Sequence, residues 1–262
     1  MGGSARGPAE RPRRALGRLL QARQGAPHLF PLLLVVLVIG AGWWLRDATP
    51  RLAGAVADPD TRIRAALALQ RSLHLSDVYG FDAGGTLELA PVRFGDLAIT
   101  VEGERARVVA MVEGEGVIDW RRGRIRVGYI GRERFSMTPC DLGGWCADGR
   151  QLDELRRVLP LLFRRLDAFN ARDAAAYGRL VGEGYRGAGG KAAVLAQLAR
   201  DFGPGPAATL TVTAWQLRVE PGRVVVGEDE RVRVGDGPET SLRARLELKE
   251  ENGRWVIVDG LM

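Results

Sequence analysis

The sequence predicts an α+β protein that begins with a single transmembrane helix and continues into a β-rich module and then a domain of helices followed by antiparallel strands. Three observations support this fold class. The 17 residues from Leu29 to Leu45 carry no charge. Segments between residues 96 and 137 alternate apolar and polar side chains, as half-buried strands do. From residue 152 apolar side chains recur at helical spacing, and four further strand patterns follow.

The positive charge of the chain lies mainly at its N-terminus. The formal net charge is +6, and residues 1–27 contain six arginines and one acid, so they carry +5 of it. The remainder is nearly neutral, which argues against a basic face for nucleic acid. We expect residues 1–27 to be a disordered cytoplasmic tail. The abundance of arginine, alanine and glycine beside only two lysines is typical of a GC-rich bacterial genome.

Residues 28–46 are predicted to form the transmembrane helix. As a helix, the uncharged run would be about 26 Å long, close to the roughly 30 Å of a bilayer core. Arginines before the run place the N-terminus in the cytoplasm, and the bulk of the chain in the periplasm or outside the cell. The alternative is a cleaved signal peptide, because Ala55–Ala57 has the form of a cleavage site. That site lies ten residues beyond the run, which favours an uncleaved signal anchor in the inner membrane.

A short linker, residues 47–58, is expected to lead into a module spanning residues 59–148. The stretch "DPDTRIRAALALQRSLHL" predicts a helix, because Asp60 or Thr61 can cap it and apolar residues return at helical spacing. His74, at its end, is expected to be a surface charge rather than a metal ligand. The segments "DLAITVEG", "ARVVAMVEGEGVIDW" and "GRIRVGYIGRERFSM" predict strands separated by glycine-containing turns.

Two cysteines, Cys140 and Cys146, end this module in "PCDLGGWC". Five residues separate them, and two are glycines, so the loop can close into a disulfide in an oxidising compartment. The alternatives are two free thiols or a metal site. A zinc site would need further ligands, and neither histidine of the chain is near in sequence. The sequence therefore favours a structural disulfide.

Residues 149–262 are predicted to form three helices followed by four strands. An apolar stripe from Leu155 to Phe169 defines the first helix, which Pro160 could kink or divide. A second helix follows "NARD", and "KAAVLAQLARDF" forms a third. The segments "TLTVTAWQLRVE", "RVVVGEDERVRV", "SLRARLELKE" and "RWVIVDG" then alternate like strands, and turn residues join them.

This domain resembles the NTF2-like (SnoaL-like) superfamily. The resemblance rests on "DAFNARDAAAYGRLV", "GGKAAVLAQLARDF" and the closing "GRWVIVDG", all within residues 152–262. It implies a curved sheet wrapped by helices into a cone with a pocket at its open end. It does not imply one function, because proteins that share a fold can have unrelated activities. A similar arrangement of valines and arginines in residues 97–116 and 215–232 leaves open that residues 59–148 are a degenerate second copy.

The resemblance also implies candidate site residues, because catalytic members of the superfamily place an aspartate base and a tyrosine donor in the pocket. The residues of this chain that could occupy such a pocket are Asp167, Tyr177, Tyr185, Trp215 and Asp259. A structural interpretation competes at each position. Asp173 is well placed as a helix N-cap, and Asp167, beside two arginines, is expected to be solvated. Tyr177 and Trp215 are expected in the core.

The sequence favours binding over catalysis. Residues 75–262 contain no histidine, which removes the most common general base and metal ligand. We find no nucleophile elbow, phosphate-binding loop or metal-ligand cluster in the sequence. We therefore expect no cofactor, and a non-catalytic periplasmic binding or scaffold module that acts with a protein partner at the membrane or as a homo-oligomer. The alternative is a membrane-tethered small-molecule isomerase or hydrolase.

Overall fold

The structure is a computed structural model that describes residues 58–81, 85–140, 143–148 and 151–261. The predicted tail, residues 1–27, the predicted span, residues 28–46, and the linker up to residue 57 lie outside the described residues.

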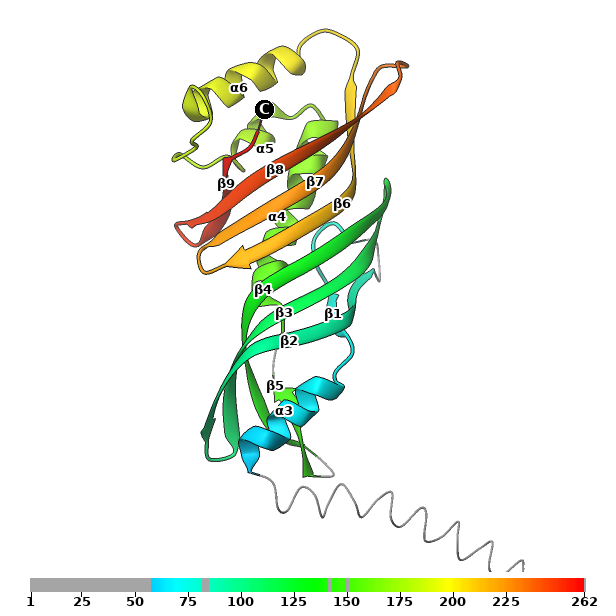
Figure 1. The fold of residues 1–262 in the computed structure, drawn as a ribbon. Coiled ribbons are helices and arrows are strands. Elements are labelled where there is room, and N and C mark those ends of the chain that lie inside the picture. The colour runs from blue at the N-terminus through cyan, green and yellow to red at the C-terminus, as the bar shows by residue number, and fades with distance from the viewer. Residues whose placement is uncertain (1–57, 82–84, 141–142, 149–150, 262) are drawn as a thin grey trace, which may run out of the picture. The chain divides into compact units, whose positions relative to one another are not determined.

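The first half of the described chain contains one helix and five strands (Figure 1). Asp58 caps the helix, because its side chain accepts a hydrogen bond from the backbone N–H of Thr61 at 3.0 Å. The three long strands alternate buried and exposed side chains along much of their length. The elements are α3 (Pro59–Leu69), β1 (Leu73–Ser76), β2 (Thr86–Glu102), β3 (Arg105–Trp120), β4 (Gly123–Cys140) and β5 (Gly144–Asp148).

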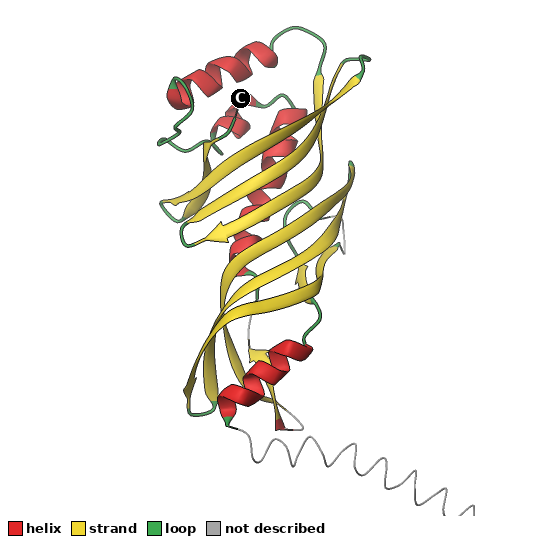
Figure 2. Ribbon diagram, in the orientation of Figure 1, coloured by secondary structure: helices red, strands yellow, loops and turns green. Residues whose placement is uncertain are grey.

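The second half contains three helices and four strands (Figure 2). The first of these helices continues through Pro160 without division. The second is short, and the side chain of Asp173 caps it by accepting a hydrogen bond from the backbone N–H of Ala176 at 2.7 Å. The elements are α4 (Asp153–Asn170), α5 (Ala174–Gly178), α6 (Gly190–Asp201), β6 (Ala208–Glu220), β7 (Arg223–Val234), β8 (Glu239–Glu251) and β9 (Arg254–Asp259).

All nine strands among the described residues belong to one sheet. Their order is β1-β2-β3-β4-β6-β7-β8-β9, and β5 pairs with the end of β4. Neighbouring strands are antiparallel except β4 and β6, which run parallel from the pair Arg126–Ala214 to the pair Gly131–Val219. Gly128 lies within this junction, where a Cβ atom would come within 2.0 Å of the Gln216 side chain. The two halves of the described chain are therefore continuous through backbone hydrogen bonds.

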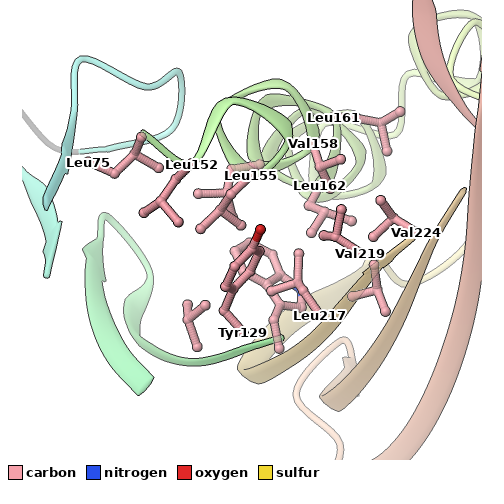
Figure 3. Close-up of a cluster of buried hydrophobic side chains, with 14 of the residues drawn as sticks. Leu75, Tyr129, Leu152, Leu155, Val158, Leu161, Leu162, Leu217, Val219 and Val224 are labelled. Atoms are coloured by element: carbon pink, nitrogen blue, oxygen red, sulfur yellow. The ribbon is translucent and has the colours of Figure 1, made fainter. Parts of the chain in front are cut away.

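Helix α4 supplies side chains to the core of both halves. It runs behind the strands of the second half, and its N-terminal end reaches β4 (Figure 1). Figure 3 shows Leu155 beside Tyr129 of β4, and Leu162 beside Val219 of β6. Phe163 is fully buried. The buried apolar residues of both halves accordingly form one continuous cluster.

Phe163 lies where the two halves meet. Its ring centroid is 6.1 Å from that of Phe81 and 5.9 Å from that of Trp120, both in the first half. It is 5.1 Å from the ring of Trp215 in β6, in an edge-to-face arrangement. Gly80 approaches the same ring with φ +95°, and a Cβ atom at this position would overlap Phe163. The packing therefore requires glycine there.

The predicted fold class is corrected in two respects. Residues 59–148 and 149–262 are predicted as two modules, but the parallel pairing of β4 with β6 joins their described strands into one nine-stranded sheet. In addition, no helix among the described residues is both long enough and apolar enough to cross a membrane. The predictions of an integral membrane protein, a signal anchor and a membrane partner are therefore corrected.

A smaller correction concerns residues 70–76. The helix expected to reach Leu75 ends at Leu69, because the backbone of Gln70 is extended. Leu73 and Leu75 are instead buried in β1, where they pair with Leu89 and Leu87. The apolar residues at 67, 73 and 75 fit a helical stripe poorly, whereas 73 and 75 fit a strand that alternates inward and outward.

The Asp173 cap gives a stability prediction. Replacing Asp173 by alanine should lower the free energy of unfolding by about 1 kcal/mol, because the N–H of Ala176 loses its acceptor. Asp173→Asn retains an acceptor oxygen and should remain close to the wild type. Urea denaturation of both variants measures this. Equal stability of the alanine variant and the wild type would show that the cap contributes nothing.

Candidate functional site

A cavity of about 720 Å³ lies in the second half of the described chain. The ends of α4 and α5, one side of α6 and the inward face of β6–β8 bound it, and the chain after β9 closes one side. Its apolar lining consists of Phe169, Val194, Leu198, Leu210, Val232, Leu242, Ala244 and Leu261. Its polar and glycine lining consists of Arg165, Tyr177, Gln197, Asp201, Glu230, Arg243, Arg245 and Gly260.

A buried network of charged and polar side chains forms the floor of this cavity. Arg165 of α4 donates from Nη1 to Glu228 at 2.5 Å and from Nη2 to Glu230 at 2.5 Å. Its Nε donates to the hydroxyl of Tyr177 at 3.2 Å. Trp215 donates from Nε1 to the second carboxylate oxygen of Glu228 at 2.7 Å. The side chain of Glu228 is 0% exposed, whereas that of Glu230 is 9% exposed and lines the cavity.

Two periodic patterns bring these residues together. In β7 the residues Val224, Val226, Glu228 and Glu230 alternate along one face, and all four are buried. The acids therefore continue the inward row of the valines. On α4, Arg165 follows Leu162 by three residues and precedes Phe169 by four, so it lies on the face that covers the sheet. A buried charged side chain needs an oppositely charged partner, and the inward arginine and the two inward glutamates meet this requirement.

The ionisation of the network follows from burial and from its excess of acid. Burial raises the pKa of the Glu228 carboxyl to about 7, because its charged form is poorly solvated. The positive charge of Arg165 opposes this shift, and the like charge of Glu230 adds to it. Burial also raises the pKa of the Tyr177 hydroxyl, against the influence of Arg165. Although burial opposes its charge, the guanidinium of Arg165 has a pKa well above its usual value, because Glu228 and Glu230 favour the charged form.

Two of the residues predicted from the sequence belong to this network. Tyr177 lines the cavity and accepts the hydrogen bond from Arg165. Trp215 is fully buried behind it, against Glu228 and Phe163. Both were also expected to be core residues, and their burial agrees with that interpretation.

Tyr185 and Asp259 lie outside the network. The Tyr185 hydroxyl accepts from the backbone N–H of Leu261 at 2.8 Å and donates to the carbonyl of Leu261 at 2.9 Å. Tyr185 therefore holds the chain end that forms one wall of the cavity. Asp259 is half exposed and lies 3.4 Å from Arg186. Neither residue lines the cavity.

Asp167 faces a different hollow. It accepts a hydrogen bond from the Tyr79 hydroxyl at 2.8 Å and is paired with Arg121. Tyr79 and Arg121 belong to the first half of the described chain, so Asp167 ties α4 to that half. Its side chain is 19% exposed, less than the solvated position expected from the sequence. The hollow around it has a volume of about 870 Å³ and lies beside α4 and β9.

Sequence reasoning missed Arg165, Glu228 and Glu230. The signal was present for the glutamates, because the alternation that makes Val224 and Val226 inward also makes Glu228 and Glu230 inward. For Arg165 the signal was its place on the apolar face of α4. Among the described residues, no group of three or more histidine, cysteine or acidic side chains could hold a metal ion. Cys140 and Cys146 form a disulfide at the end of β4, and neither lines the cavity.

The chain matches no protein-family model. No curated protein matches it either.

Solved structures resemble part of the chain. An NTF2-like protein of unknown function from Pseudomonas putida KT2440 is 16% identical, with a TM-score of 0.36, over 39% of this chain and 80% of its own. A proposed dehydratase of the NTF2-like family from Streptomyces avermitilis is 15% identical, with a TM-score of 0.35, over 41% and 92%. A protein of unknown function with a cystatin-like fold from Nostoc punctiforme is 12% identical, with a TM-score of 0.35, over 42% and 88%.

The matched structures include NTF2-like proteins, the class that the sequence resembles, and each match extends over about two fifths of this chain with a TM-score below 0.4.

The raised pKa of Glu228 gives a prediction with a defined sign. Its folded pKa of about 7 exceeds its ordinary value of 4.5, so the folded state binds more protons between these values. The free energy of unfolding should therefore fall as pH rises through this window and stay lower above it. Glu228→Gln removes the titrating group and should flatten the profile.

Urea denaturation between about pH 5 and pH 8 measures the effect. Glu220→Gln, at an exposed position on β6, is the matched control and should keep the wild-type slope. Parallel profiles for the wild type and Glu228→Gln would contradict the assignment of the buried proton to this network.

Proposed function

We propose that the protein is a non-catalytic binding module whose cavity takes a small, largely apolar ligand. The proposal rests on the partners and the exposure of the two acidic side chains that line the cavity, Glu230 and Asp201. Glu230 forms an ion pair with the buried guanidinium of Arg165, and Asp201 is exposed at the surface, where it accepts a hydrogen bond from Gln197 at 2.8 Å. A general base takes up a proton during the reaction, and protonation of Glu230 would break this ion pair.

The size and lining of the cavity support a ligand of this kind. A volume of about 720 Å³ lies within the range of small-molecule sites, roughly 300–1,000 Å³. Apolar side chains from α4, α6, β6, β7, β8 and the chain end surround it, and a few polar groups are gathered at its floor. Burial of the ligand's apolar surface against such a lining favours binding, and the polar groups orient the ligand.

The second candidate is a small-molecule isomerase or hydrolase. The raised pKa of Glu228 favours it, because a carboxyl that titrates near neutrality can move protons. However, Glu228 is 0% exposed and lies behind Glu230, and both of its oxygens accept hydrogen bonds from Arg165 and Trp215. A ligand in the cavity would meet Glu230 first, so the geometry favours binding.

We also propose that residues 58–261 lie in an oxidising compartment outside the cytoplasm. The disulfide between Cys140 and Cys146 supports this location, because reducing cytoplasm rarely allows such bonds to persist. The test is to alkylate protein from cells without reductant and weigh it. Addition of two alkyl groups would contradict the proposal.

The binding function predicts that filling the cavity abolishes ligand uptake. Nile red, a neutral apolar dye, should bind the full chain with increased fluorescence. Leu198→Trp places a large ring where a buried leucine of α6 lines the cavity, and should reduce dye binding at least about tenfold by steric exclusion.

The matched control is Leu195→Trp, on the same helix at a position that is 37% exposed and does not line the cavity. It should bind the dye like the wild type, and circular dichroism should show that both variants are folded. Equal dye binding by the two tryptophan variants would mean that the cavity is not the binding site.

A further inference from the structure

We infer that the ligand of this cavity is a small organic cation with an apolar body, and that its positive charge pairs with the carboxylate of Glu230. The inference rests on the proposed binding function and adds the charge of the ligand to it. It follows from the balance of charge in the floor of the cavity and from the hydrogen bonds already made there.

The floor contains two carboxylates and one guanidinium. All three nitrogen atoms of Arg165 already donate hydrogen bonds, to Tyr177, Glu228 and Glu230. Both oxygens of Glu228 also accept hydrogen bonds. Glu230 accepts a hydrogen bond from Arg165 through Oε1 and lies within hydrogen-bond reach of Glu228, and it is the carboxylate of the two that lines the cavity. A cation there would complete the pairing of the second carboxylate.

The other charged side chains near the cavity also favour a cationic ligand. Arg243 pairs across the sheet with Asp229, and its Nε lies 3.4 Å from that carboxylate, so its side chain lies on the outward face. Arg245 is two residues further along β8 and shares that face. The inward face of the cavity therefore carries Arg165 against Glu228, Glu230 and the rim residue Asp201. An anionic ligand would face this excess of acid, and the guanidinium of Arg165 is already paired with both carboxylates.

Two aromatic side chains of the cavity lining also suit a cation with an apolar body. Phe169 and Tyr177 both line the cavity, with ring centroids 6.4 Å apart. The faces of such rings attract positive charge, and their area favours an apolar body. A short ammonium with a phenyl or cyclohexyl group would fit the chemistry of floor and walls.

A bound cation should compete with a proton. The groups that face Glu228 are Arg165 from α4, Tyr177 from α5, Trp215 from β6 and Glu230 from β7. β8 places Ala244 opposite Glu228, which adds no charge. With one guanidinium for two carboxylates, the second negative charge is offset either by a proton or by the ligand. The affinity for a cation should therefore fall as pH drops below about 7, where the network takes up its proton.

The test is isothermal titration calorimetry of the full chain with three probes of similar shape: 2-phenylethylammonium, 2-phenylethanol and 3-phenylpropionate. At about pH 8 the cation should bind about tenfold or more tightly than the neutral alcohol, and the anion most weakly. Glu230→Gln should abolish the preference for the cation. Asp229→Asn, the adjacent residue on the outward face of β7, is the matched control and should keep it.

A neutral or anionic probe that binds as tightly as the cation would overturn the inference and leave the binding function intact. Absence of binding by all three probes and by Nile red would instead overturn the binding function itself. Should Glu230→Gln not fold, the wild type decides the question. Its affinity for the cation must fall between about pH 8 and pH 6 while that for the alcohol stays constant, and equal pH dependence of the two would overturn the inference.

Discussion

The packing of Phe163 between the two halves of the sheet is the constraint on which the described structure depends. Its ring contacts Phe81 and Trp120 on one side and Trp215 on the other, and it is fully buried. A phenylalanine at such a site contributes about 3–5 kcal/mol relative to alanine. The parallel pairing of β4 with β6 gives the same junction a backbone connection. Helix α3 buries Ile63 and Leu67 against the first half, and α4 adds the side chains that join this core to that of the second half.

The same helix sets the chemistry of the cavity. Phe163 and Arg165 are two residues apart on α4, so fixing the ring against the sheet also fixes the guanidinium above Glu228 and Glu230. Trp215 connects the two sites, because it packs on Phe163 and donates to Glu228. A buried guanidinium with two carboxylates is costly to desolvate, and such groups are retained where they specify a geometry or a function. Here the geometry leaves one carboxylate facing the cavity, which is the basis of the proposed ligand charge.

Local periodicity made much of the second half predictable. The apolar stripe of α4, the Asp173 cap and the four closing strands follow from spacing and turn residues, and the structure has them within a few residues of the expected bounds. The joining of β4 to β6 could not be predicted, because it depends on pairing between segments about 90 residues apart. In the candidate site, Tyr177 and Trp215 were found as residue types suited to a pocket. Arg165 and Glu228 were missed because a charged residue in an amphipathic pattern is ordinarily assigned to the solvent face.

The shared core around α4 implies that the two halves unfold as one cooperative unit. Native-state hydrogen exchange of the full chain measures this by comparing protected amides of β3 and β4 with those of β6 and β7. The slowest amides of both halves should exchange through the same global unfolding, with equal free energies and equal dependence on denaturant. Two distinct free energies, with one half exchanging while the other stays protected, would contradict it. The shared core would then be two separate cores in contact.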